Sequence, residues 1–268
     1  IAEMLSYPFL VRALAGGVLV SLCPALLGVS LVLKRYSMIG DGLSHVSFGA
    51  LSIAVAFGWS PLQVSIPVVV VAAFFLLRIT ENGKLNSDAA IAVISASALA
   101  VGITVTALTT GMTTDVSSYM FGSILAMSRE DVILAAGLSV VVLFLFIFFY
   151  HKVFAVTFDE NFARATGVKV SWYHILFAVL TAVTIVLGMR MMGAMLISSL
   201  IIFPALTAMR LFKSFRGVMI AAGAVAVVCF LAGMVISYQA STPAGASVVL
   251  VNLAVFLVCA AVQRIRGR

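Results

Sequence analysis

Charged residues are scarce in this sequence. Only 9% of its 268 residues are Asp, Glu, Lys or Arg, whereas 63% are hydrophobic. Soluble domains carry about 25% charged residues, and disordered chains are poor in apolar residues. The composition therefore excludes a soluble enzyme and a disordered chain, and it predicts an all-α protein that crosses a membrane many times. At about 20 apolar residues per span, no room remains for a soluble domain, so we expect residues 1–268 to form a single transmembrane domain.

Cysteines are few, and the common catalytic motifs are missing. The three cysteines have no CxxC spacing, which argues against a disulfide framework or a cysteine metal site. The sequence contains no GxxxxGK[ST] loop, GxSxG elbow, HExxH pair or GxGxxG turn. We therefore expect no ATPase activity in this chain and no permanently bound cofactor. Active transport would need energy from a partner subunit or from an ion gradient.

Stretches without charge divide the chain into nine expected spans. Two long stretches are split, at residues 59–61 (Trp-Ser-Pro) and at the polar segment 238–243, because proline starts helices and tryptophan favours the membrane interface. If the first segment does not cross fully, the count is eight. Residues 115–127 are moderately apolar but too short to span, which indicates a re-entrant or an interfacial helix. The stretches that carry the spans are residues 13–33, 42–77, 89–114, 132–150, 170–189, 191–209 and 217–263.

The basic residues predict the orientation of these spans. When nine spans alternate in direction, only Arg12, Arg129 and Arg190 fall on one side, and the other thirteen of the 16 Lys and Arg residues fall on the opposite side. Lys and Arg concentrate on the cytoplasmic side of membrane proteins. We therefore expect a multi-pass protein of the cell membrane with its N-terminus outside and its C-terminus in the cytoplasm.

A short helix is expected in the longest cytoplasmic connection, over residues 157–167. Thr157 or Asp159 can cap its start, and Gly167 can end it in the left-handed conformation. The pattern fits two roles equally well, an interfacial helix that lies on lipid or a docking helix for a soluble partner. The two histidines that flank this connection, His151 and His174, are expected to be solvated at the interface.

Asp41 and His45 are the notable ionisable pair within an expected span. They are four residues apart, so a helix places them on one face. A carboxylate and an imidazole suit a divalent cation such as zinc or manganese, and two ligands suit transient binding in a pathway. The alternative is structural, in which Asp41 caps the helix and His45 bonds to a neighbouring helix. The topology places the pair near the cytoplasmic end of the second span, so an interrupted or deeply inserted helix would be needed to bring it into a pathway.

Five stretches, taken in order along the chain, resemble one family, the membrane permease subunits of ATP-binding-cassette importers for zinc, manganese or iron. They are residues 40–45 (GDGLSH), 115–125 (DVSSYMFGSIL), 158–163 (FDENFA) with Gly167, 193–208 (GAMLISSLIIFPALTA) and 242–250 (TPAGASVVL). The resemblance implies a homodimer or paired permeases, two ATPase subunits in the cytoplasm and one extracytoplasmic metal-binding protein. It also implies that Asp41 and His45 are pathway residues for the metal.

The same resemblance implies that the helix in the long connection is the coupling helix that meets the ATPase. The positions that it assigns to this contact are Phe158, Asp159, Glu160, Phe162, Arg164 and Gly167. The expected function is thus an ATP-driven importer's permease for divalent metal ions, with zinc favoured over manganese or iron and no binding to nucleic acid. An ion-gradient carrier acting alone is the alternative, but it calls for paired acids in the membrane interior, and none is evident. A membrane scaffold without transport activity is a third reading.

Overall fold

The computed structural model describes residues 8–81, 87–109 and 129–265, and these residues form helices without any strand among them. Eight helices in this part of the chain are long and apolar enough to cross a membrane, and a ninth span results if the bent pair α7 and α8 counts as one. The prediction of an all-α protein with eight or nine spans is confirmed, whereas the predicted re-entrant or interfacial helix at residues 115–127 lies outside the described residues. The helices are α2 (Pro8–Leu33), α3 (Ile39–Ala56), α4 (Pro61–Glu81), α5 (Ser87–Leu108), α7 (Arg129–Phe148), α8 (Tyr150–Phe158), α9 (Glu160–Ala165), α10 (Val170–Met192), α11 (Ala194–Leu211), α12 (Phe215–Ala240) and α13 (Ala244–Ile265).

Two predicted breaks between spans are confirmed. α4 begins at Pro61, after a turn in which Gly58 has a φ of 69°. The positive φ suits glycine, which lacks a Cβ, and the fixed φ of proline suits the first position of a helix. At the second break, Ser241 adopts the left-handed conformation after α12, and α13 begins at Ala244.

The predicted helix over residues 157–167 is wrong at its start. Thr157 belongs to α8, where its hydroxyl donates a hydrogen bond of 2.7 Å to the carbonyl of Val153 instead of capping a new helix. α8 itself leaves α7 at an angle of 67°. The break comes at Asp159, whose backbone is extended, and α9 begins at the next residue. The connection between the spans is therefore largely helical and turns twice.

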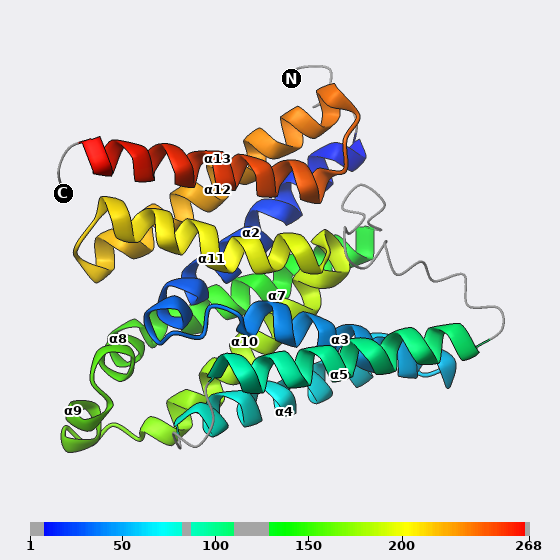
Figure 1. Ribbon diagram of the computed structural model, residues 1–268, viewed down its shortest axis with the longest axis horizontal. Helices are drawn as coiled ribbons and strands as arrows, with labels where there is room; N and C mark the ends of the chain where they lie inside the picture. Colours follow the sequence, from blue (N-terminus) through cyan, green and yellow to red (C-terminus); the bar gives the residue numbers. More distant parts are fainter. Residues whose placement is uncertain (1–7, 82–86, 110–128, 266–268) are drawn as a thin grey trace.

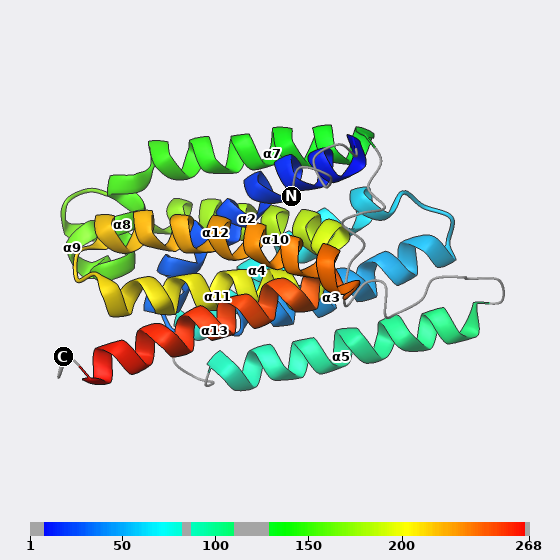
Figure 2. The same cartoon turned by 90° about the horizontal axis from the view of Figure 1, so that it is seen from above.

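The helices lie side by side along one long direction, with α8, α9 and the last turns of α13 at one end (Figure 1, left) and the start of α2 and the turn between α12 and α13 at the other. We call the first of these the α9 end. α2 and α10 run through the middle, where 67% of each span is buried, while α5 lies at the edge with 11% buried (Figure 2). The inner helices thus form the core, and the outer ones present apolar surface to the membrane.

α3 packs against α5 in the same direction along the bundle. A Cβ added at Gly42 would lie 2.7 Å from Cγ2 of Ile91, and one added at Gly49 would lie 2.7 Å from the carbonyl oxygen of Ala98. Both contacts join residues that are 49 positions apart, so the two helices are parallel. This arrangement agrees with alternating spans, in which the second and the fourth run the same way. Close helix contact through glycine is the usual device in membranes.

Candidate functional site

Asp41 and His45 lie together on one face of α3, as their spacing predicts. Oδ2 of Asp41 is 3.6 Å from Nε2 of His45. The side chain of Asp41 is 43% exposed, and that of His45 is 16% exposed. The separation exceeds a hydrogen bond, so both groups keep free lone pairs with which they could hold a cation.

The glycines beside Asp41 determine which way it faces. A Cβ at Gly40 would come within 2.6 Å of Cδ1 of Ile201 on α11, and a Cβ at Gly42 would meet α5. Because successive helix residues are about 100° apart, Asp41 points between α11 and α5. Leu43, on roughly the opposite face of α3, is fully buried in the hydrophobic core. The pair therefore faces away from the core of its own chain.

The start of α3 lies deep in the bundle when measured against α11. Gly40 lies next to Ser198 and Ile201, which are the fifth and eighth residues of the 18-residue α11. α3 is continuous from Ile39 to Ala56, so no interruption is needed to bring Asp41 to this depth. The continuous α3 thus begins beside the middle part of α11, which fits a deeply inserted helix rather than an interrupted one.

The pair is an incomplete metal site in a single chain. Among the described residues, no group of three or more His, Cys, Asp or Glu side chains is placed to hold a metal ion. A closed zinc site has four ligands. Asp41 and His45 supply two donors, so any cation held here needs ligands from outside this chain or from water.

The α9 helix is a short turn closed at both ends by its own sequence. The carboxylate of Asp159 accepts a hydrogen bond of 2.9 Å from the backbone N–H of Phe162, which confirms it as the cap. Gly167 has a φ of 82°, and its N–H and that of Val168 bond to the carbonyls of Arg164 and Ala163. This pattern of two bonds is the Schellman motif, and it confirms that Gly167 ends the helix.

One side of α9 is buried and the other projects outward. Ala163 is fully buried, in a small cluster with Val156 and Val170. Phe162 is 62% exposed, and Phe158 at the end of α8 is also exposed, although its ring contacts that of Phe215. Two exposed aromatic side chains at one end of a membrane protein are suited to contact with a protein partner.

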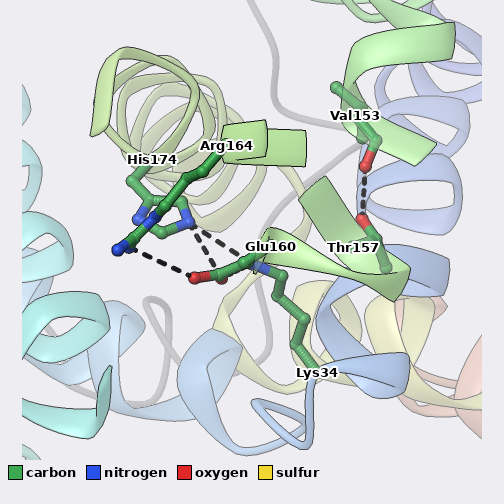
Figure 3. A network of polar contacts seen from close by, with 6 residues as sticks. All are labelled: Lys34, Val153, Thr157, Glu160, Arg164 and His174. Carbon is green, nitrogen blue, oxygen red and sulfur yellow. Dashed lines mark hydrogen bonds and ion pairs between the residues drawn. The ribbon is translucent and has the colours of Figure 1, made fainter. Parts of the chain in front are cut away.

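Glu160 is the centre of a polar network that ties α9 to two spans (Figure 3). Its Oε1 accepts a hydrogen bond of 2.7 Å from Nζ of Lys34, one residue after α2, and lies 3.1 Å from Nε2 of His174 on α10. Its Oε2 is 3.7 Å from the guanidinium of Arg164, one turn later in α9. We call these four residues the Glu160 network. α9 is thereby tied to the end of α2 and the start of α10.

The surroundings of Glu160 favour its ionised form. Burial alone would raise the pKa of this carboxyl, but the hydrogen bond and the positive charge of Lys34, with a smaller contribution from His174, outweigh burial and lower the pKa. Glu160 is therefore a carboxylate at neutral pH and attracts the cations around it.

Sequence reasoning missed two members of the Glu160 network. His174 is not a solvated interfacial residue, because its side chain is only 14% exposed and contacts Glu160. For Lys34, the sequence alone indicates only a role in the topology. The partners are 126 and 14 residues from Glu160 along the chain, and no local spacing links them. His151 is exposed, and its solvation at the interface stays a prediction.

Comparison with known proteins gives concordant matches. The sequence profile of the ABC 3 transport family matches residues 6–263. The manganese transport system membrane protein MntC of Halalkalibacterium halodurans is 29% identical over 254 residues, which cover 95% of this chain and 87% of that protein. The high-affinity zinc uptake system membrane protein ZnuB of Haemophilus influenzae is 27% identical over 251 residues, with 94% and 96% covered. A chain in the structure of PsaBC from Streptococcus pneumoniae, in complex with Fab, superimposes with a TM-score of 0.85 at 29% identity and covers 96% of this chain and 94% of that one.

Proposed function

The chain belongs to the ABC 3 transport family, and we propose that it is the membrane permease of an ATP-driven importer for divalent metal ions. The observation that carries this proposal is the Asp41–His45 pair, which offers a carboxylate and an imidazole on one exposed helix face deep in the bundle. Relatives named for manganese transport and for zinc uptake match nearly the whole chain, which supports a transition metal as the cargo.

We propose that two copies of the permease face each other through this surface. Asp41 and His45 point away from their own core and supply only two donors. A second copy would add the same two, and four donors from carboxylates and imidazoles match the coordination number that zinc prefers. A site shared between copies can also open when they move apart, which is how cargo would be released.

Zinc is the metal that we propose first, ahead of manganese or iron. The argument is the chemistry of His45, because imidazole suits zinc, whereas manganese prefers oxygen ligands. The relatives do not decide between the metals, since those named for manganese and for zinc match to similar extents. The identity of the transported metal therefore has to be determined by uptake experiments in which the metals compete.

We propose that α9 is the coupling helix, which contacts an ATPase subunit and transmits its conformational change to the permease. Phe158 and Phe162 would insert into the partner, while Asp159 and Gly167 hold the shape of the helix. Glu160 and Arg164 would pass the motion to Lys34 at the end of α2 through the Glu160 network. Only a short turn separates Lys34 from α3 and Asp41. An extracytoplasmic metal-binding protein would deliver cargo at the opposite end of the bundle.

Uptake by the assembled complex tests this proposal. The permease is reconstituted in vesicles with its ATPase subunit and its metal-binding protein, and radioactive zinc uptake is measured with and without ATP and with excess manganese or iron. We expect ATP-dependent zinc uptake that manganese and iron inhibit weakly. Stronger inhibition by manganese would overturn the zinc preference alone. Uptake by the permease without an ATPase, driven by an ion gradient, would overturn the importer in favour of the independent carrier.

A further inference from the structure

A basic cleft adjoins the Glu160 network, shares Arg164 and His174 with it, and includes neither the metal pair nor the exposed aromatic side of α9. It has a volume of about 260 Å³ and lies between α4, α9 and α10, close to the lower end of the ~300–1,000 Å³ typical of small-molecule sites. Arg78 of α4 and Arg164 of α9 line it from two helices, together with Ser171 and His174 of α10. The cleft is therefore lined by cations and hydrogen-bond donors.

The charges around the cleft are not balanced by the described side chains. Glu160 is the one carboxylate in the network, and it already accepts a hydrogen bond from Lys34. Arg164 is 3.7 Å from the other carboxylate oxygen, beyond hydrogen-bonding distance, and is largely exposed. Arg78 lies over the ring of Phe74, at 5.7 Å, and makes no ion pair with a carboxylate among the side chains that the structure describes. Of the described residues, two arginines and no carboxylate thus line the cleft, which leaves donors for a further anion.

The apolar part of the cleft lies deeper in the bundle than its cations. Phe74 precedes Arg78 by one turn of α4, on the side away from the α9 end, and Ile175 follows Ser171 by about one turn of α10 in the same direction. Phe75 and Ile175 are exposed on these two spans. Polar groups at the end of the spans and apolar groups below them reproduce the order of headgroup and acyl chain in a lipid leaflet.

We propose that this cleft binds the phosphate of an anionic phospholipid from the surrounding leaflet. The two arginines and Ser171 would contact the headgroup, and the acyl chains would lie along Phe74 and Ile175. Basic pockets between membrane helices are known to take lipid headgroups of this charge. A carboxylate of a soluble partner would satisfy the arginines but not the apolar side chains beneath them, so the lipid accounts for the whole cleft. The proposal rests on the fold and the charges, independently of which ion is carried.

Binding of defined lipids to the intact complex tests the proposal. The permease is purified with its ATPase subunit, stripped of lipid in a neutral detergent, and titrated with phosphatidylglycerol or phosphatidylcholine while bound lipid is counted by native mass spectrometry. We expect preferential binding of phosphatidylglycerol, and a loss of affinity of about fivefold in Arg78→Gln, since one basic residue near a membrane surface contributes about 1 kcal/mol. Arg78→Lys should restore most of the affinity, because lysine keeps the charge.

The control is Arg216→Gln, which removes an exposed arginine from the start of α12, outside the cleft. It should bind phosphatidylglycerol as the unchanged protein does, and each variant must elute as a monodisperse complex. Equal binding of both lipids, or undiminished binding of phosphatidylglycerol by Arg78→Gln, would overturn the proposal. Displacement of the lipid by an equal concentration of inorganic phosphate would also overturn it, in favour of a site for the free anion. Failure of the complex to bind any lipid here would assign the arginines to the ATPase instead.

Discussion

The start of α3 and the connection through α9 are held in place by different kinds of interaction. α3 is held by close packing, with its glycines against α11 and α5. Among the described side chains, Asp41 and His45 form an ionic contact only with each other. α9 is held by charge in addition to the small apolar cluster around Ala163, because Glu160 contacts Lys34 just after α2 and His174 of α10. The difference fits the proposed roles. Groups that bind and release an ion must stay available, whereas an element that transmits a stroke must stay attached.

Reversing the charge at the centre of the Glu160 network should have the largest effect. Glu160→Lys puts a third cation beside Lys34 and Arg164. We expect it to lower the free energy of unfolding by about 3 kcal/mol, the upper end of the value of a hydrogen bond to a charged group, because the bond to half-buried Lys34 is replaced by repulsion. It should also uncouple ATP hydrolysis from transport. The measurements are unfolding of the purified permease in SDS and the ratio of ATP hydrolysed to zinc transported. Asn161→Lys introduces a lysine at an exposed neighbour outside the network and should change neither quantity. Equal coupling in the two variants would remove the network from the transmission path.

The close packing of α3 against α5 predicts a smaller loss of unfolding free energy when a glycine is replaced, and this loss should not depend on salt or pH. A Cβ in Gly49→Ala would press on the backbone carbonyl of Ala98, and overpacking of this kind costs about 1–3 kcal/mol. Gly137→Ala is the matched control, since a Cβ there meets nothing within 4 Å, and we expect it to stabilise α7 by up to about 1 kcal/mol. The measurement is SDS unfolding of both variants. If Gly49→Ala is as stable as Gly137→Ala, the close contact of α3 and α5 is not needed.

The effect of pH on stability should also distinguish the α9 region from the start of α3. The pKa of Glu160 is lowered in the folded protein, so its contribution is present above the ordinary Glu value of about 4.3 and is lost as the pH falls through the lowered folded value. At pH 7, Glu160→Gln should lower the free energy of unfolding by about 1.5 kcal/mol, the lower end of the value of a hydrogen bond to a charged group. The difference in unfolding free energy between Glu160→Gln and the unchanged protein should shrink in acid. The corresponding difference for Gly49→Ala should stay constant. Thermal unfolding at a series of pH values tests this, and a gap that widens in acid would contradict it.

The smallest effect is expected at the edge of the network. Arg164 is exposed and 3.7 Å from Glu160, so Arg164→Gln should lower the free energy of unfolding by at most about 1 kcal/mol. The cost should vanish in ~1 M salt, where the Debye length is about 3 Å. SDS unfolding at low and high salt measures it. If the loss of stability persists in high salt, Arg164 stabilises the protein by packing of its side chain and not by an ion pair with Glu160.

The sequence predicts best those features that depend on local signals. The breaks after Trp59 and at Ser241 were predictable because proline and polar residues interrupt long apolar runs. The pairing of Asp41 with His45 followed from their spacing within one helix. Asp159 was one of two possible caps, and the choice depended on the hydroxyl of Thr157, which bonds within α8.

Features that depend on distant parts of the chain were not predictable. The 67° bend at Phe149 interrupts an aromatic run without proline or glycine. The contact of Glu160 with Lys34 joins residues that are 126 positions apart, and it required the arrangement of α2, α9 and α10. The depth of Asp41 depended on the packing of Gly40 against the middle of α11. In a chain with so few charges, the topology explains where they lie, but only the packing shows which of them meet.

The role of Asp41 and His45 as receivers of the ion is tested by ATP-driven zinc uptake in the variants Asp41→Ala and His45→Ala. Each variant is assembled with the ATPase and the metal-binding protein, and assembly and basal ATP hydrolysis are measured beside uptake. If the pair receives the ion, each variant should lose at least about tenfold in uptake, the effect of roughly 1.4 kcal/mol at the ion's binding step, while assembly and basal hydrolysis are retained. Full uptake in both variants would contradict the account, because the ion would then pass without the only pair that α3 presents to it.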